Sequence, residues 1–222
     1  MPPITLEDVR RDRQVLEAIK ESDKSLAVLG YTNHGLRHLN LAAGRAQAIA
    51  NALRLGKRET ELAAIAAFCH DMGNFLGRTQ HHYWGALLFH QMFQDRMTSD
   101  ELLIVVQAIA NHDKEEMKFT SRAAAITVLA DKSDVHRSRV RKKPMKEIMG
   151  DIHNRVNYAV TFSDLRLDPK KKRVDLILKI DANFVSMLEY FEIFTERMRY
   201  CRTAAEFLGW DFGLVANGAK LI

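Results

Sequence analysis

The stretch LAAIAAFCHDMG, residues 62–73, decides how the rest of the chain is interpreted. Its first part, Leu62 to Cys69, is almost entirely apolar, which is typical of a buried helix. His70 and Asp71 follow directly, and Gly73 interrupts the pattern two residues later. A buried imidazole or carboxylate is costly unless it is paired or bound to a metal. We therefore expect a metal site at the end of a central buried helix.

The sequence on both sides of this stretch predicts further helices. Apolar residues recur with the helical period, and polar or glycine residues stand where helices should begin and end. We expect helices over about residues 5–22, 24–29, 34–55, 81–93, 99–111 and 119–140, with a loop over 73–80. The residues expected at helix starts are Thr5 (in a capping box with Asp8), Asn33 and Ser99, and those expected at helix ends are Gly30 and Gly56.

The pattern changes near residue 155. Apolar and polar residues alternate over 156–162 and again over 174–180, which predicts a β-hairpin. A long amphipathic helix should follow over 184–208, with Gly209 as its stop, and the last residues, 212–222, would add a short strand. We expect a mainly α fold: a helical domain over residues 1–150, and a β-hairpin plus helix over 151–222 packed on it as an α+β appendage.

Composition narrows the class of protein. With 222 residues, 47% of them hydrophobic, the chain can bury one large core, and nothing predicts disorder. The net charge is +5, and basic runs at 137–143 and 170–173 favour anionic partners, although a solvated charged face explains each run equally well. Cys69 and Cys201 lie in apolar contexts and indicate a reducing compartment. Without a signal region or a run of ~18 apolar residues, we expect a soluble cytoplasmic protein with no membrane partner.

Further candidate ligands lie at intervals around the His70-Asp71 pair. His38 falls on the preceding helix, on the same face as His34, and Asp131 falls late in the helical series, three residues before Asp134. Two imidazoles and two carboxylates suit a divalent ion such as Mn, Fe, Ni, Co, Mg or Zn. Four protein ligands leave positions open for water and substrate, as in catalytic sites. His81 and His112, at the ends of neighbouring helices, are candidates to hold a second ion, so we expect one or two.

This ordered set resembles the HD-domain superfamily of metal-dependent phosphohydrolases over roughly residues 30–140. FCHDMG matches the defining dyad of that family, and the first histidine ligand comes from NHGLRHLN, where the family uses the second of two histidines four residues apart, His38. The segments HHYWGALL, AIANHD and LADKSDVHR resemble the remaining family motifs, giving His81 in preference to His82, His112, and Asp131 with Arg137. Each motif is weak alone, whereas the ordered set is specific.

The resemblance implies an all-helical core around a metal and hydrolysis of a phosphate ester or anhydride. A small phosphorylated compound, with a nucleotide favoured, would be the substrate. His70 and Asp71 would be catalytic, with Asp71 bridging two ions or orienting the attacking water. Positive side chains suit the phosphates that do not react, and His34 suits a substrate contact, a supporting contact behind a ligand, or a helix cap. The candidate substrate-binding residues are His34, Arg78, Lys114, Lys132 and Arg137.

Two other functions stay open at this point. The same scaffold hosts di-iron oxygenases, for which His81, His112 and His34 would supply the extra ligands. A non-catalytic module could bind a nucleotide or RNA through the basic runs, but the intact ligand set argues against it, so nucleic acid is open and not favoured; homo-oligomerisation is also open. The remaining histidines, His82, His90, His136 and His153, are expected to pack or to face solvent, and Asp134 to orient a ligand or face solvent.

Overall fold

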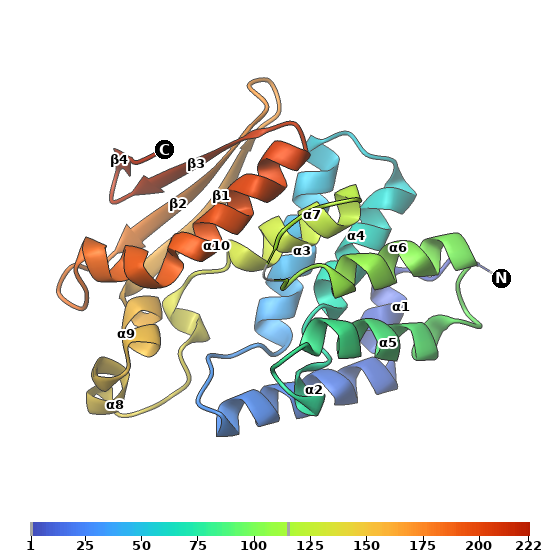
Figure 1. The fold of residues 1–222 in the computed structure, drawn as a ribbon, viewed down its shortest axis with the longest axis horizontal. Coiled ribbons are helices and arrows are strands. Elements are labelled where there is room, and N and C mark those ends of the chain that lie inside the picture. Colours follow the sequence, from blue (N-terminus) through green and yellow to red (C-terminus); the bar gives the residue numbers. More distant parts are fainter. Residues whose placement is uncertain (1, 115) are drawn as a thin grey trace. The chain divides into compact units, whose positions relative to one another are not determined.

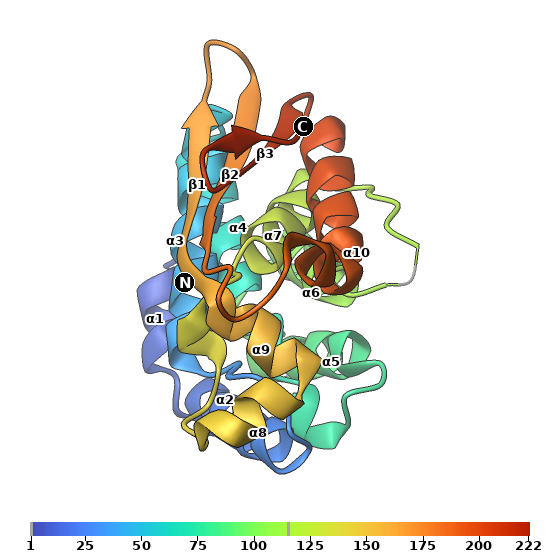
Figure 2. The same cartoon turned by 90° about the vertical axis from the view of Figure 1, so that its left-hand side faces the viewer.

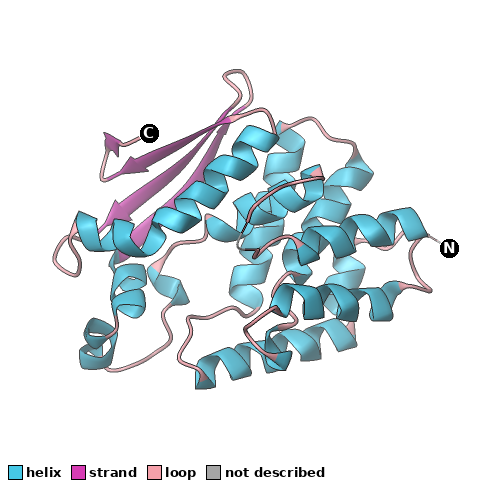
Figure 3. Cartoon of the chain, viewed as in Figure 1, coloured by secondary structure: helices cyan, strands magenta, loops and turns pink. Residues whose placement is uncertain are grey.

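The computed structural model describes residues 2–114 and 116–222, which form two compact units that divide between Asp131 and Lys132 (Figure 1). The first unit is helical, and the second combines helices with a small sheet (Figure 3). The expected fold class, mainly α with a β appendage, is confirmed. The two compact units divide earlier in the chain than residue 150. The functional domain boundary expected after residue 150 stays a prediction.

Helices build the first unit. In chain order they are α1 (Leu6–Arg11), α2 (Arg13–Val28), α3 (Leu36–Ala52), α4 (Lys57–Cys69), the short 3₁₀ turn η1 (Asn74–Leu76), α5 (His81–Phe93), α6 (Ser99–Ala110) and α7 (Arg122–Lys132).

Helix α4 is the centre of this unit, as the sequence predicted. Every residue from Leu62 to Cys69 is buried, and α4 packs against α1, α3 and α6. Four of these residues are alanines, so the neighbouring helices approach closely and few side-chain degrees of freedom are fixed. The end of α4 therefore emerges inside the unit, and His70 and Asp71 are buried there.

The N-terminal helices differ from the prediction. The capping box of Thr5 and Asp8 is confirmed, but the helix that it starts ends at Arg11. Asp12 interrupts the helix because its carboxylate accepts the N–H groups of Gln14 and Val15, as a new N-cap. The second helix then continues to Val28, so the predicted break before residue 24 is wrong. The stop at Gly30 is confirmed by its φ of +84°.

Helix α3 begins later than predicted. Asn33 does not cap it: the Asn33 side chain accepts the N–H of Gly35, and Gly35 occupies the N-cap position. His34 therefore precedes the helix, and the prediction that it shares a helix face with His38 is wrong. The end is also earlier, at Ala52, and Gly56 is the N-cap of α4 instead of a stop.

Two further helix ends differ. The first residue of α6 is Ser99, so the N-cap position falls to Thr98 and Ser99 is not the cap. Helix α7 covers 122–132 instead of 119–140. The chain then forms a separate 3₁₀ turn, η2 (Arg137–Arg139), because the ring of His136 accepts the N–H of Ser138. Asp134 lies beyond the helix, so it does not share a helix face with Asp131.

The second unit carries the sheet. After η2 its elements are α8 (Met145–Gly150), α9 (Ile152–Ala159), β1 (Val160–Asp168), β2 (Arg173–Ile180), α10 (Met187–Phe207), β3 (Asp211–Ala216) and β4 (Ala219–Lys220). The described strands follow the order β1-β2-β3-β4, antiparallel except for the parallel β2–β3 pair. Helix α10 connects these two parallel strands and packs against β3 (Figure 2).

The predicted hairpin is confirmed in its second strand and shifted in its first. Residues 152–159 are helical because Asp151 accepts the N–H of Asn154 as an N-cap, so β1 begins only at Val160. The long helix is confirmed, and its stop Gly209 has a φ of +76°. The expected short C-terminal strand is present as β3, to which β4 adds a two-residue partner.

Within the part of the chain that the structure describes, every helix is too short or too polar to cross a lipid bilayer.

Candidate metal centre

Three histidines of the first unit are held in the same way. In each, the ring Nδ1–H donates to the main-chain carbonyl three residues earlier, which can only accept, so the proton must be on Nδ1. The pairs are His70 with Ala67 at 2.8 Å, His81 with Arg78 at 3.0 Å and His112 with Ile109 at 2.7 Å. The Nε2 atoms are thereby left to face the interior, each with its lone pair when the ring is neutral.

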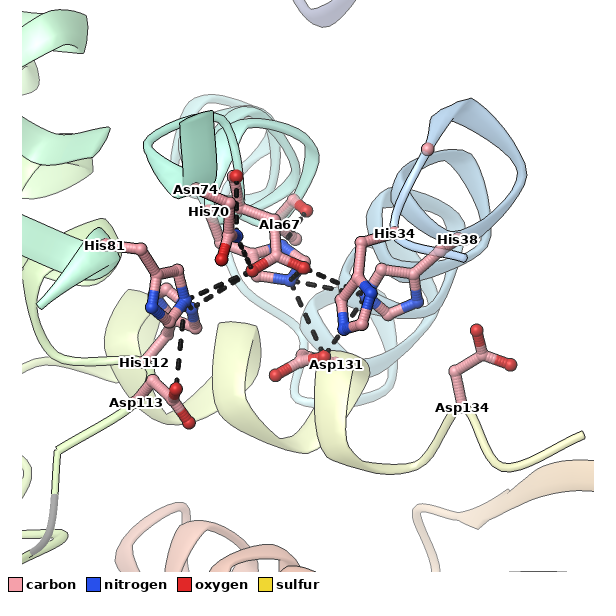
Figure 4. Close-up of polar contacts among 12 residues, drawn as sticks. His34, His38, Ala67, His70, Asn74, His81, His112, Asp113, Asp131 and Asp134 are labelled. Atoms are coloured by element: carbon pink, nitrogen blue, oxygen red, sulfur yellow. Dashed lines mark hydrogen bonds and ion pairs between the residues drawn. The ribbon is translucent and has the colours of Figure 1, made fainter. Parts of the chain in front are cut away.

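The first ligand cluster joins α3, the end of α4 and α7. His38 Nε2 lies 3.2 Å from Asp131 Oδ1 and 3.7 Å from Asp71 Oδ2. His70 Nε2 lies 3.2 Å from Asp71 Oδ2, 3.5 Å from Asp131 Oδ1 and 3.3 Å from His38 Nε2 (Figure 4). The four residues expected as ligands of the first ion are therefore brought together, all of them buried.

The second ligand cluster lies on the other side of Asp71. His81 Nε2, from the start of α5, is 3.2 Å from Asp71 Oδ1 and 3.0 Å from His112 Nε2. His112 follows the end of α6, and its Nε2 is 3.9 Å from the same carboxylate oxygen. In Figure 4 the rings of His81 and His112 lie on one side of His70, and the ring of His38 lies on the other. The two oxygens of Asp71 thus point into different clusters.

Asn74 fixes the orientation of this carboxylate, and sequence reasoning missed it. Its side-chain amide donates to Asp71 Oδ1 and to the Asp71 main-chain carbonyl, both at 2.8 Å. Asn74 is only 1% exposed, so its hydrogen bonds are screened little by water. The sequence signal was slight: an asparagine three residues after the aspartate, at the start of a turn.

Charge in the first cluster is strongly coupled. Burial alone would lower the pKa of His70, but the carboxylates of Asp71 and Asp131 outweigh it and raise this pKa to about 10. Burial would raise the pKa of Asp71, yet the nearby charges of His70 and His34, together with a hydrogen bond from His70, hold it well below its usual range. The carboxylates therefore require a positive charge between them, which a proton on His70 supplies in the absence of another cation.

The donor set fits a divalent ion. Both His81 and His112 carry their proton on Nδ1, so their Nε2 lone pairs face each other at 3.0 Å, an arrangement that a cation between them would stabilise. Sets of three donor atoms within 4.8 Å of one another occur in the first cluster (His38, His70 and Asp71), in the second (Asp71, His81 and His112) and across the two (His70, His112 and Asp131). Nitrogen and carboxylate oxygen donors of this kind suit divalent transition metals and Mg.

A cleft of about 630 Å³ opens beside the second cluster. Its lining residues come from the start of α5 and from the segment after α6: Arg78, Thr79, Gln80, His81, His82, Tyr83, Asp113, Lys114 and Glu116. Two of the predicted substrate contacts, Arg78 and Lys114, are therefore placed in one cleft with His81. Lys114 lies with its Nζ 5.6 Å from the Tyr83 ring.

The other predicted residues are placed as follows. His34 is buried just before α3, with its Nδ1–H donating to the Thr32 carbonyl at 2.6 Å and its ring centroid 5.8 Å from that of His38. Lys132 and Arg137 belong to the second unit, where the Arg137 Nε–H donates to the Tyr158 carbonyl at 3.1 Å. Their expected roles at the site stay predictions.

The histidines and the aspartate that were assigned no ligand role have clear structural positions. His82 is buried with its ring 4.2 Å from that of Tyr83, so it packs instead of facing solvent. His90 is half-buried, and His153 is exposed. Asp134 is buried in the second unit, with its Oδ2 3.9 Å from Arg139 Nη1, so it does not face solvent, and the other expected role, orienting a ligand, stays a prediction.

Asp113 is a second residue that sequence reasoning did not assign to the site. Its Oδ2 lies 3.3 Å from Arg78 Nη2 and 3.7 Å from His81 Nε2. The signal was its position directly after His112, which repeats the order of the His70-Asp71 pair. Side chains at a helix end diverge, and only the fold could show that this one returns to the cleft.

The comparisons with known proteins agree with this arrangement. The family model described as HD domain matches residues 33–136, a range that contains every residue of both clusters. The chain is also similar to an uncharacterized protein, MJ1020, of Methanocaldococcus jannaschii, with 24% identity over 213 residues that cover 85% of this chain and 82% of the relative. The resemblance of the ordered motifs to the HD-domain superfamily is therefore supported by a family match over residues 33–136.

Proposed function

We propose that this protein is a metal-dependent phosphohydrolase that cleaves a phosphate ester or anhydride of a small compound, with a nucleotide as the favoured class. One observation carries the proposal: the two oxygens of the buried Asp71 face separate histidine clusters, and the second cluster borders an open cleft. A bridging carboxylate beside a cleft is the arrangement of two-metal hydrolytic sites. The HD domain supports the same class of enzyme.

The two clusters assign the ligands. His38, His70, Asp71 and Asp131 would hold one divalent ion, of Mn, Fe, Co, Ni, Mg or Zn, and Asp71, His81 and His112 would hold a second. When bound, such ions lower the pKa of a coordinated water toward ~7 and polarise the phosphoryl oxygen.

The protein's own groups then position the reaction. Asn74 holds Asp71 in one orientation, so this carboxylate can accept a hydrogen bond from the attacking water along a fixed direction. In the cleft, the guanidinium of Arg78 and the ammonium of Lys114 bind phosphate oxygens that do not react. His34, Lys132 and Arg137 stay candidates for further substrate contacts.

The cleft also supports the choice of substrate. Its volume of about 630 Å³ suits a small molecule, and Tyr83, which is 42% exposed, offers a ring face to a base or sugar beside Lys114. We place the protein in the cytoplasm, where its buried thiols, Cys69 and Cys201, stay reduced. Membrane and nucleic-acid partners are not required by this function.

The test is a hydrolysis screen. The chelator-treated protein is supplied with Mn, Mg, Co or Ni and assayed on nucleotides, dinucleotides and sugar phosphates for released phosphate. We expect turnover of at least one compound, its loss in Asp71→Asn, and its retention in His90→Ala, which alters a histidine on the same helix as His81 but away from the clusters. No turnover with any metal, or equal turnover in Asp71→Asn, would contradict the proposal, and metal-dependent dioxygen consumption would favour the oxygenase instead.

A further inference from the structure

Arg78 engages both ring nitrogens of His81. Its main-chain carbonyl accepts the Nδ1–H of His81 at 3.0 Å, and its side-chain Nη1 donates to His81 Nε2 at 3.2 Å. The first contact fixes the tautomer, and the second uses the lone pair that this tautomer exposes. Arg78 therefore fixes the His81 tautomer that can bind a metal and, at the same time, occupies the Nε2 atom that would bind it.

The guanidinium occupies the edge of the second cluster. Nη1 also lies 3.7 Å from Asp71 Oδ1 and 3.1 Å from Asn74 Oδ1, while Nη2 lies 3.3 Å from Asp113 Oδ2. Two of the three ligand atoms expected for a second ion, His81 Nε2 and Asp71 Oδ1, thus already face a positive charge. We propose that the Arg78 guanidinium and a second divalent cation compete for this position, so that the ion binds only when Arg78 moves away.

The chemistry of imidazole requires this competition. A neutral imidazole nitrogen has one lone pair, so His81 Nε2 cannot accept the Arg78 N–H and bind a cation at the same time. Two positive charges a few ångströms apart in a buried site also repel strongly. The Arg78 guanidinium and the second ion therefore cannot occupy this position together, and in the metal-free protein the guanidinium lies there.

The Arg78 side chain can move into the adjacent cleft. Arg78 is 29% exposed and lines the cleft, and Asp113, on the same cleft, keeps an acceptor for its Nη2. Rotation into the cleft would place the fork-shaped donor where a phosphate can accept from it. Loading of the second ion and preparation of the anion-binding cleft would then be one event. This inference rests on the metal centre proposed above, and it does not depend on which phosphate is cleaved.

The experiment is a calorimetric titration of Mn²⁺ into the chelator-treated full-length protein. In Arg78→Gln we expect the second ion to bind at least about tenfold more tightly than in the wild type, with the first ion unchanged, because only the second position loses a competing charge. Lys114→Gln is the matched control: it removes a positive charge from the same cleft, and it should leave both affinities within about twofold of the wild type. An unchanged or weaker second ion in Arg78→Gln overturns the proposal, as does equal tightening in Lys114→Gln.

A second experiment adds a free guanidinium compound to a variant that lacks the Arg78 side chain. In Arg78→Ala, methylguanidinium at millimolar concentration should weaken binding of the second Mn²⁺ ion, whereas tetramethylammonium at equal ionic strength should not. Equal effects of the two cations would overturn the competition. The outcomes also separate this inference from the hydrolytic function: hydrolysis with no change in metal affinity in Arg78→Gln defeats only the inference, and the expected affinities without any hydrolysis defeat only the function. Failure of wild type and variant to bind any Mn²⁺ defeats both.

Discussion

At the residue scale, the site depends on groups that hold the ligands. Asn74 donates two hydrogen bonds to Asp71, one to the carboxylate and one to the main chain, and both are buried. Main-chain carbonyls play the same part for His70, His81 and His112. Such partners orient a ligand before the ion arrives, which lowers the entropy lost on binding.

Replacing Asn74 by Ala should weaken metal binding by about 10–100-fold, the usual effect of removing a partner behind a ligand. The carboxylate of Asp71 would then be free to rotate away from one of the two clusters. Titration with Mn²⁺ measures the loss, and Asn40→Ala, which removes an exposed asparagine of α3, is the control. Equal affinities of wild type and Asn74→Ala would show that Asp71 is held by other contacts.

The metal-free protein should lose stability as pH rises from about 6.5 to about 10. The pKa of His70 is raised from 6.5 to about 10 in the folded protein, so in this range the folded state holds a proton that the unfolded state has released. The free energy of unfolding should therefore fall with pH, by at most about 1.4 kcal/mol per pH unit.

Urea unfolding at several pH values in the presence of a chelator measures this slope. In His70→Gln the contribution should vanish, and saturating metal should remove it in the wild type, because metal binding displaces the proton. A slope that is flat or rising in the metal-free wild type, relative to His70→Gln, would contradict the charge assignment.

At the scale of elements, the turn after α4 and the start of α5 are in direct contact. A Cβ atom on Gly73 would lie 2.2 Å from the His81 carbonyl oxygen and 2.4 Å from the Gly85 nitrogen, distances that main-chain atoms cannot relieve without moving. The absence of a side chain at this glycine therefore sets how near His81 stands to Asp71.

Gly73→Ala should destabilise the protein by about 1–3 kcal/mol, as expected for overpacking against main-chain atoms. It should also separate the two clusters, so that the second ion is lost while the first is kept. Thermal unfolding and elemental analysis test the two effects. Gly44→Ala is the control: it lies within α3 with open space around it and should stabilise the protein by about 0.5–1 kcal/mol. A well-folded Gly73→Ala variant that retains two ions would exclude this role.

The sequence predicted elements best where one strong signal decides them. The apolar run of α4 is compatible only with a buried helix, and the apolar residues at helical spacing in α10 are compatible only with an amphipathic helix. Helix ends depend on competing hydrogen bonds that the sequence does not rank. Asp12 caps α2 and so separates it from α1, where one helix was predicted. Asn33 forms a turn before α3 instead of capping it. Asp151 caps α9 in a segment whose alternating side chains predicted a strand.

At the scale of the whole molecule, all the expected ligands of both ions belong to the first unit. They come from α3, the end of α4, the start of α5, the end of α6 and α7, so residues far apart in sequence meet at one place. The ordered motifs were sufficient to predict that meeting. They did not predict Asn74 or Asp113, whose contacts depend on how two short turns fold back, and no periodic pattern encodes such turns.

Metal should therefore stabilise the two units unequally. Metal binding stabilises the segments that carry the ligands. We therefore expect Mn²⁺ to slow amide hydrogen exchange at residues 67–76 and 108–112, and to leave exchange in strands β2 and β3 little changed. Hydrogen exchange with mass spectrometry, with and without chelator, measures both regions in one sample. Equal protection of the sheet and of the metal centre would show instead that the two units open as a single cooperative body.

A carboxylate shared between two cations has a consequence for measurements of composition. If ions occupy both proposed positions, each would place a positive charge ~3.5–4 Å from the other. Each ion would then lower the affinity of its neighbour, and by thermodynamic linkage the effect would be reciprocal. Asp71 would make the pair anticooperative, with one ion held tightly and the other only partly at ordinary concentrations. A homogeneous, fully folded sample would then contain a fractional number of ions per chain, and that number would rise smoothly with the free metal in the buffer.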